Sequence, residues 1–186
     1  AGNVGWTRTV RSADETAEAS LAAVEAALGP PGRVASLILP ADCLWESGPE
    51  PLSTRPMPKL REPDSHVVQE GARLLRNGRG GILLGGNALD ERGLRAAAQV
   101  AAATDCRVWI ETFPSRQERG CHLPGFPALP YFPEKAREAL AQVTSLVLAG
   151  AREPVAFFAY PDQPSRLAPE GAALHMLADP DADVDA

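Results

Sequence analysis

The chain has 186 residues, a formal net charge of −6, and a composition of 45% hydrophobic and 23% charged residues that is typical of a globular protein. The acidic balance argues against a surface that binds nucleic acid or anionic membranes. No apolar run approaches the roughly 20 residues that span a bilayer, and the opening AGNVGWTRTVRSADE does not have the apolar stretch of a signal segment. Its three cysteines, Cys43, Cys106 and Cys121, are an odd number with no CxxC spacing, so neither a disulfide framework nor a zinc site is indicated, and we expect a reduced, cytoplasmic protein.

The first piece, residues 1–46, predicts one helix and one strand. Ser12 and Glu15 form an S-x-x-E capping box before apolar residues at helical spacing: Ala17, Leu21, Val24 and Leu28. Residues 34–39 (VASLIL) form a continuous apolar run, which predicts a strand buried on both faces. One helix and one strand cannot enclose a core, so this piece is interpreted as the end of a domain whose beginning is missing.

Two further segments lack the periodicity of helices and strands. Residues 47–63 hold too many prolines for a helix or sheet, which predicts an extended interdomain linker rather than a proline-motif ligand. At the other end, residues 179–186 place an aspartate at every second position. We expect a solvated acidic tail or the start of another linker there, and no EF-hand.

Residues 64–178 alternate helix and strand signals. Helices are expected to open at Asp64, Asp90 and Pro133. Apolar strands are expected at 80–86, 106–110, 145–149 and 155–159, with a short last one at 174–177. This order predicts an α/β fold, a Rossmann-like parallel sheet with helices on both faces, preceded by the partial α/β segment.

The ionisable residues form no recognisable catalytic or metal pattern. His66, His122 and His175 are far apart in the sequence, and none lies in an HExxH or nucleophile-elbow motif. Cys121 and His122 are adjacent, but neighbours in sequence usually point apart and no further ligand is near them in the sequence. We therefore predict no catalytic and no metal-binding residue in this chain.

Two turns lie where parallel sheets bind ligands, at the carboxyl ends of strands. Gly85, Gly86 and Asn87 follow the first central strand, and glycine there lets backbone amides approach a phosphate or ribose. The segment is not GxGxxG, so a simple tight turn stays an open alternative. The same geometry is predicted at Gly150-Ala151-Arg152, where the arginine either pairs with an anionic ligand or is a surface charge.

The stretch 112–132 shows no periodicity and is long for a loop inside a compact domain. It carries Arg116 and Arg119 together with several aromatic residues. Two interpretations stay open: a loop that contacts a cofactor or another domain, and a proline-stiffened surface segment.

Three segments together resemble a known family. VASLILPADCLWESGPEPL is similar to the end of the pyrimidine-binding domain of thiamine diphosphate-dependent enzymes, RLLRNGRGGILLGGNAL to the opening of their central domain, and SLVLAGAREPVAFFAYPDQPS to its later strands. The resemblance covers essentially the whole chain and is strongest to the acetolactate synthase large-subunit-like branch. It implies a fragment that holds the central domain and the end of the pyrimidine-binding domain.

The resemblance also implies what the parent enzyme would need. The family's activating glutamate would precede Ala1, and its Gly-Asp-Gly segment for diphosphate and magnesium is absent. The parent would therefore be a 2-oxo acid decarboxylase or carboligase that uses thiamine diphosphate and Mg²⁺, with both sites outside this chain. Its partners would be the missing catalytic domains of the same chain, in a homodimer or tetramer. The fragment alone is expected to be inactive.

In this family the central domain holds FAD, ADP or nothing. Positions matching such a site are Gly85, Gly86, Asn87, Arg116, Arg119, Gly150, Ala151 and Arg152. The residues after Arg152 are Glu153-Pro154-Val155 and depart from the flavin-binding pattern, so the resemblance favours a vestigial or adenine-nucleotide site. Two alternatives stay open: a free-standing FAD- or adenine-nucleotide-binding module without catalysis, and a purely structural interaction domain.

Overall fold

The computed structural model describes residues 5–29, 33–53, 62–161 and 163–178. The chain divides into two compact units, residues 1–60 and 61–186, and each is considered by itself. Within the described residues, no helix is both long enough and apolar enough to cross a bilayer. The predicted linker (47–63) lies partly, and the predicted acidic tail (179–186) wholly, outside these residues.

The first unit is a small α/β element. Strands β1 (Trp6–Thr9) and β2 (Ala35–Ile38) pair in parallel, and helix α1 (Thr16–Leu28) connects them and packs on them. Two 3-10 turns complete it, η1 (Ala13–Glu15) before the helix and η2 (Asp42–Leu44) after β2. Strand β1 is a finding that the sequence did not predict, because a four-residue stretch with two polar side chains carries little strand signal.

Two expectations for this unit were wrong. Ser12 makes no side-chain cap, and the Glu15 carboxylate instead accepts a hydrogen bond from the Arg11 N–H at 3.2 Å. Residues 34–39 do not form a strand buried on both faces, since β2 is half-buried along most of its length. The reason is that α1 is the one α-helix among the described residues of this unit, and it covers one face of the sheet.

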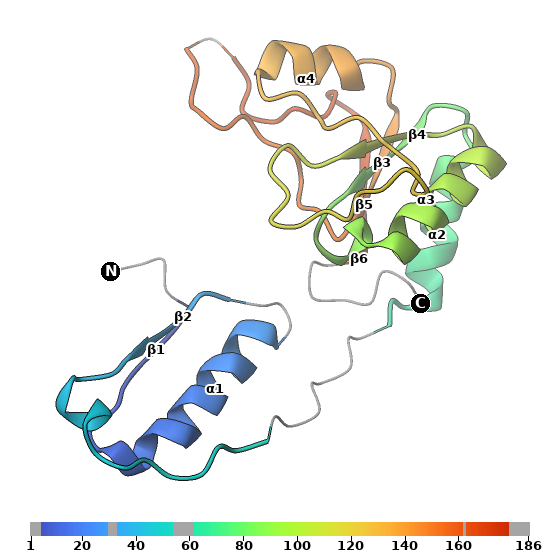
Figure 1. Cartoon of the computed structure of the whole chain (residues 1–186). Coiled ribbons are helices and arrows are strands. Elements are labelled where there is room, and N and C mark those ends of the chain that lie inside the picture. Colours follow the sequence, from blue (N-terminus) through green and yellow to red (C-terminus); the bar gives the residue numbers. More distant parts are fainter. Residues whose placement is uncertain (1–4, 30–32, 54–61, 162, 179–186) are drawn as a thin grey trace. The chain divides into compact units, whose positions relative to one another are not determined.

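The second unit is built on a four-stranded parallel sheet. Its strands are β3 (Gly80–Leu84), β4 (Arg107–Ile110), β5 (Ser145–Ala149) and β6 (Ala173–Ala178), in the spatial order β4-β3-β5-β6. Helices α2 (Ser65–Leu75), α3 (Glu91–Thr104) and α4 (Pro133–Leu140) precede or connect them, with a 3-10 turn η3 (Gly86–Leu89) before α3. The α/β fold predicted from the alternating signals is confirmed (Figure 1).

The three helix starts have the predicted chemistry. Asp64 Oδ1 accepts from the His66 N–H at 2.7 Å, and Asp90 Oδ1 accepts from the Gly93 N–H at 2.8 Å. Each aspartate satisfies an amide that has no partner inside its helix. Pro133 occupies the first turn of α4, where its missing N–H costs nothing.

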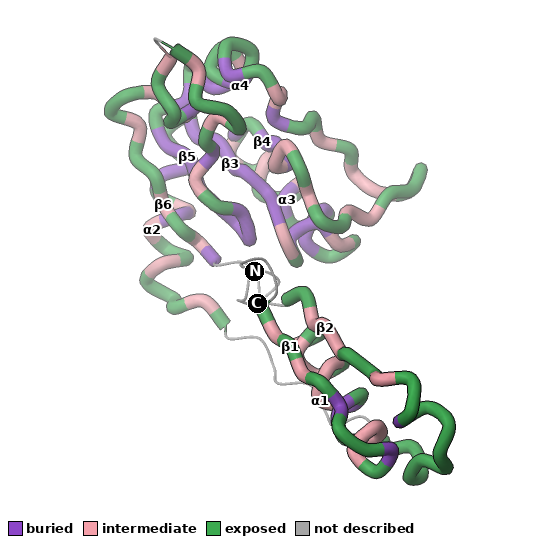
Figure 2. The backbone as a smooth tube through the Cα atoms, turned by 90° about the vertical axis from the view of Figure 1, so that its left-hand side faces the viewer, coloured by how far each residue is buried: buried purple, intermediate pink, exposed green. Residues whose placement is uncertain are grey.

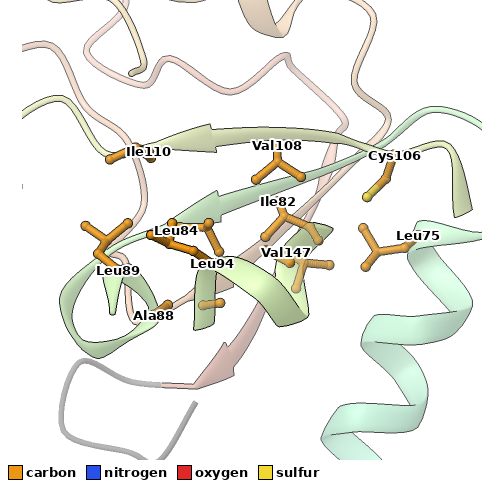
Figure 3. Close-up of a cluster of buried hydrophobic side chains, with 12 residues drawn as sticks. Leu75, Ile82, Leu84, Ala88, Leu89, Leu94, Cys106, Val108, Ile110 and Val147 are labelled. Carbon is orange, nitrogen blue, oxygen red and sulfur yellow. The ribbon is translucent and has the colours of Figure 1, made fainter. Parts of the chain in front are cut away.

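Alternation along the strands divides the core between the two faces of the sheet. On one face, Ile82, Val108 and Val147 pack with Leu75 of α2 and Leu94 of α3 (Figure 3). The opposite face carries the intervening residues of the same strands together with α4: Leu83, Trp109, Leu146, Leu148, Ala136 and Leu140. Helices therefore cover both faces, and β3 and β5 are buried throughout (Figure 2).

Two connections differ from the expectations. Residues 155–159 form no strand; Val155 makes a single antiparallel bridge to Arg166. In the 112–132 stretch, Ala128 makes a parallel bridge to Ile110, and the Leu129 N–H donates to the Ile110 carbonyl at 2.7 Å. That stretch thus extends the sheet by one short pairing beside β4.

Candidate functional site

The ends of three neighbouring strands converge at one edge of the second unit. Because β4, β3 and β5 are adjacent and parallel, their carboxyl ends bring Glu111, Gly85-Gly86 and Gly150-Ala151 together. This is the edge at which open α/β sheets bind ligands. The two predicted glycine turns therefore do belong to one place in the fold.

The glycines at this edge are required by close backbone contact. Gly150 has φ +64°, and a methyl group on it would collide with the carbonyl oxygen of Gly85. A methyl group on Gly85 would lie 2.9 Å from the Cα of Ala151. The Gly85 N–H donates to the Ala149 carbonyl at 3.0 Å, which ties the two turns together. The absence of side chains here serves packing between β3 and β5.

The side chain of Glu111, which was not predicted as a site residue, contacts the Gly85-Gly86 turn. Glu111 follows β4, and its Oε1 accepts a long hydrogen bond of 3.4 Å from the Gly86 N–H. The same oxygen would lie 2.8 Å from a methyl group on Gly85. Burial raises the pKa of the Glu111 carboxyl, and the Gly86 N–H and the charge of Arg152 offset this rise only in part. The available signal was an acidic residue directly after a buried strand.

The carboxylate decides how well the turn fits a phosphate. A phosphate bound at a strand-to-helix turn is held by backbone N–H groups, and the Gly86 N–H already has an internal acceptor. An ionised Glu111 would also repel a second anion at this distance. The residues at this edge therefore fit a nucleotide diphosphate poorly.

The two predicted loop arginines are engaged with residues of their own loop. Arg116, whose side chain is 82% exposed, pairs with Glu118 at 3.0 Å. Arg119 donates to the Gln117 side-chain oxygen at 3.1 Å. Glu118 in turn accepts from the Glu91 N–H at 2.7 Å, so this part of the loop caps α3. The guanidinium groups of both arginines therefore bond to neighbouring residues of the loop and not to the glycine turn.

The remaining predicted residues divide between core and surface. Ala151 is fully buried and packs in the cluster under α4, whereas Asn87 and Arg152 are exposed. The positive charge of Arg152 nevertheless acts on the carboxyl edge of the sheet, because it lowers the pKa of Glu111. The structure therefore brings together the glycines and Ala151, adds Glu111, and leaves Asn87, Arg116 and Arg119 outside that contact.

The described residues contain no group of three or more His, Cys, Asp or Glu side chains arranged to hold a metal ion. The three histidines lie on separate elements, as their sequence positions implied. His175 of β6 has a structural contact, with Nε2 at 2.8 Å from the Val67 carbonyl of α2.

No family model matches the chain. A curated protein of Mycobacterium tuberculosis, described as "Putative acetolactate synthase large subunit IlvX", is 43% identical over 184 residues, which is 98% of this chain but 35% of that protein. Thus the chain spans about a third of the length of this relative.

Solved structures with the same fold carry related descriptions. One is a thiamine diphosphate-dependent 4-hydroxybenzoylformate decarboxylase of Rhodococcus jostii, with a TM-score of 0.68, 22% identity, and coverage of 92% of this chain and 33% of that one. Another is the benzoylformate decarboxylase of Polynucleobacter necessarius, with a TM-score of 0.67, 23% identity, and coverage of 93% and 32%. At these identities the likeness concerns the fold. Together with the curated relative, it confirms the resemblance to a segment of thiamine diphosphate-dependent, acetolactate synthase-like enzymes.

Proposed function

We propose that this chain, as a segment similar to thiamine diphosphate-dependent enzymes of the acetolactate synthase large-subunit type, serves an architectural role in a longer 2-oxo acid decarboxylase or carboligase. One observation carries the proposal: 98% of the chain aligns at 43% identity with 35% of such a relative. The segment alone is proposed to be catalytically inactive.

The cofactor sites of the parent enzyme would lie outside this chain. Thiamine diphosphate, when bound, would supply a nucleophilic ring carbon and an electron sink for the negative charge that develops at the reacting carbonyl carbon. We place that cofactor and its Mg²⁺ outside this chain, in a cytoplasmic homodimer or tetramer. The present residues would then hold the remaining parts of the polypeptide in position.

For the carboxyl edge we propose a vestigial nucleotide site. Glycine turns at the ends of β3 and β5 favour a nucleotide-binding ancestry for this edge. Glu111 opposes present use by FAD or ADP, because its carboxylate accepts from the Gly86 N–H that a phosphate would need. The second candidate, a free-standing FAD- or adenine-nucleotide-binding module without catalysis, is favoured by the same glycine turns.

The mass of the native polypeptide in its source cells tests the main proposal. A mass well above the 19.7 kDa of this chain is expected, and release of CO₂ from a 2-oxo acid by the longer protein should require added thiamine diphosphate and Mg²⁺. The 186-residue chain should show no such release. A native mass of 19.7 kDa would refute the proposal.

Thermal-shift measurements with FAD, ADP and coenzyme A separate the two candidates. The architectural role predicts no shift for the wild-type chain with any of the three. Glu111→Gln removes the charge and keeps an acceptor for the Gly86 N–H, so it serves as the sensitised variant. A saturable shift of the wild-type chain with FAD or ADP would favour the nucleotide-binding module.

A further inference from the structure

Six aromatic side chains form a connected cluster at the surface of the second unit. We call it the aromatic patch: Phe113, Tyr131, Phe132, Phe157, Phe158 and Tyr160. Neighbouring ring centroids are 4.9–6.4 Å apart, mostly edge to face. Phe157 is nevertheless 63% exposed and Phe113 is 61% exposed.

The patch is assembled from two connections, the one from β4 to α4 and the one from β5 to β6. Phe113 follows β4, Tyr131 and Phe132 precede α4, and the other three rings lie between β5 and β6. The sequences that carry these rings, TFPS, PALPYFP and PVAFFAYP, contain no charged residue. Depletion of charge with enrichment in Tyr and Phe is the composition of the buried centre of protein interfaces.

The exposed rings of the β5–β6 connection lie beyond a base, in which backbone hydrogen bonds join residues 154–156 to residues 165–167. The Ala156 N–H donates to the Ser165 carbonyl at 2.7 Å, and the Leu167 N–H donates to the Pro154 carbonyl at 3.1 Å. An ion pair between Arg166 and Glu153 at 3.0 Å adds to this base. Leu167 is buried in the core cluster under α4, so the base is anchored while Phe157 and Phe158 project from it.

The local sequence and the observed environment disagree in this connection. Residues 155–159 predict a buried strand, because every one of them is apolar and two are aromatic. In the structure they form no strand and both phenylalanines are exposed. Such conflicts between local pattern and tertiary environment concentrate at functional sites, and contiguous exposed aromatic surface marks a contact surface.

We propose that the aromatic patch is a docking surface for another part of a longer polypeptide, an uncharged, apolar surface within the length that the relative has beyond the matched segment. This inference rests on the proposed function. The match to 35% of the relative leaves most of that protein's length available as the occupant. Pairing of two copies through this face is the alternative that the experiment distinguishes.

Other occupants fit the patch less well. A single planar ligand would contact two rings, whereas here six rings from two connections lie mostly edge to face with one another. A nucleic acid or another polyanion would need cationic side chains, and the three ring-bearing sequences contain none.

The test compares the native longer polypeptide with the 186-residue chain. The double variant Phe157→Ser/Phe158→Ser removes the projecting rings, and Val68→Ser/Val100→Ser is the matched control on exposed helix positions. In the longer protein we expect the first variant to lower Tm by about 5 °C or more and the control to change it little. In the 186-residue chain we expect both double variants to change Tm only slightly.

Hydrogen exchange supplies a second readout that does not depend on variants. Peptides covering residues 155–160 should exchange at least about tenfold more slowly in the longer protein than in the 186-residue chain. Equal exchange and equal Tm effects in both proteins would overturn the inference while leaving the parent's CO₂ release, and hence the proposed function, intact.

Two further outcomes would also overturn it. One is a 186-residue chain that dimerises in sedimentation analysis and loses dimerisation on Phe157→Ser/Phe158→Ser, which would assign the patch to a second copy. The other is protection of residues 155–160 only after FAD or ADP is added, which would assign it to a ligand. A native polypeptide of 19.7 kDa would refute both this inference and the proposed function.

Discussion

The two units use similar residues to different effect. In the first unit, the buried cluster consists of Val10, Ala19 and Cys43, while Leu28 is 65% exposed and Trp45 is 83% exposed. In the second unit, two clusters lie on opposite faces of one sheet, and its two inner strands are buried at every residue. The difference shows that a sheet covered on both faces buries far more of its apolar residues than a sheet covered on one face.

The largest expected effect is a core truncation that contrasts the two units. Leu146 is fully buried in β5, so Leu146→Ala should lower the free energy of unfolding of the second unit by about 2–5 kcal/mol. Leu28→Ala in α1 should change that of the first unit by less than about 1 kcal/mol, because its side chain is mostly in water. Urea denaturation followed by circular dichroism measures both. Equal losses would contradict the contrast between a layered core and a one-sided one.

A second prediction tests the contact between the β3 and β5 turns. Gly150→Ala should cost at least about 2 kcal/mol, from the positive φ and from the collision with the Gly85 carbonyl. Gly171→Ala is the matched control, because Gly171 has φ +81° and open space around it. That control isolates the conformational cost of about 1–2 kcal/mol. Thermal unfolding of both variants gives the steric part by difference, and similar losses would mean that the close approach is unimportant.

Helix capping provides a smaller contrast between the units. Asp90→Ala should destabilise the second unit by about 1 kcal/mol, because the Gly93 N–H loses its acceptor. Ser12→Ala in the first unit should cost almost nothing, since the Ser12 side chain makes no capping bond. Denaturation midpoints of the two variants, each compared with wild type, measure the two losses of stability. A loss on Ser12→Ala as large as that on Asp90→Ala would restore the capping-box prediction.

The smallest effect concerns pH at the shared edge. The folded state raises the pKa of Glu111, so its contribution to stability is present below the unfolded-state pKa and is lost as pH rises through the folded-state pKa. Glu111→Gln should therefore match wild type at acidic pH and become the more stable protein, by a few degrees in Tm at most, toward neutral pH. Melting curves across that range measure this. A constant offset at every pH would rule out the charge of Glu111 as the cause.

Most of the second unit was predictable because local signals and tertiary environment agree there. The run GGILLGG indicated β3, Asp64, Asp90 and Pro133 marked helix starts, and the alternation of elements indicated the parallel sheet. Each signal depends on nearest neighbours in the chain: the apolar runs, the capping side chains and the fixed φ of proline. Two of the three segments that carry the resemblance to thiamine diphosphate-dependent enzymes also lie in this unit.

Other features depended on contacts between distant residues. Strand β1 exists because Trp6–Thr9 pairs with Ala35–Ile38 across α1, and no local pattern announces that pairing. Glu111 meets the Gly86 N–H because β3 and β4 are neighbours in the sheet, although the two residues are 25 positions apart in the chain. Residues 155–159 carry the pattern of a strand but form the exposed aromatic tip of a pinned connection.

The sequence by itself thus determined the α/β class, the starts of α2, α3 and α4, and the buried strands β3 and β5, because these depend on short-range periodicity and capping. Only the tertiary structure decided that the glycine turns close on Glu111 and that six aromatic side chains meet at the surface. Those arrangements depend on strand order and on the packing of connections, which bring together residues that share no local signal.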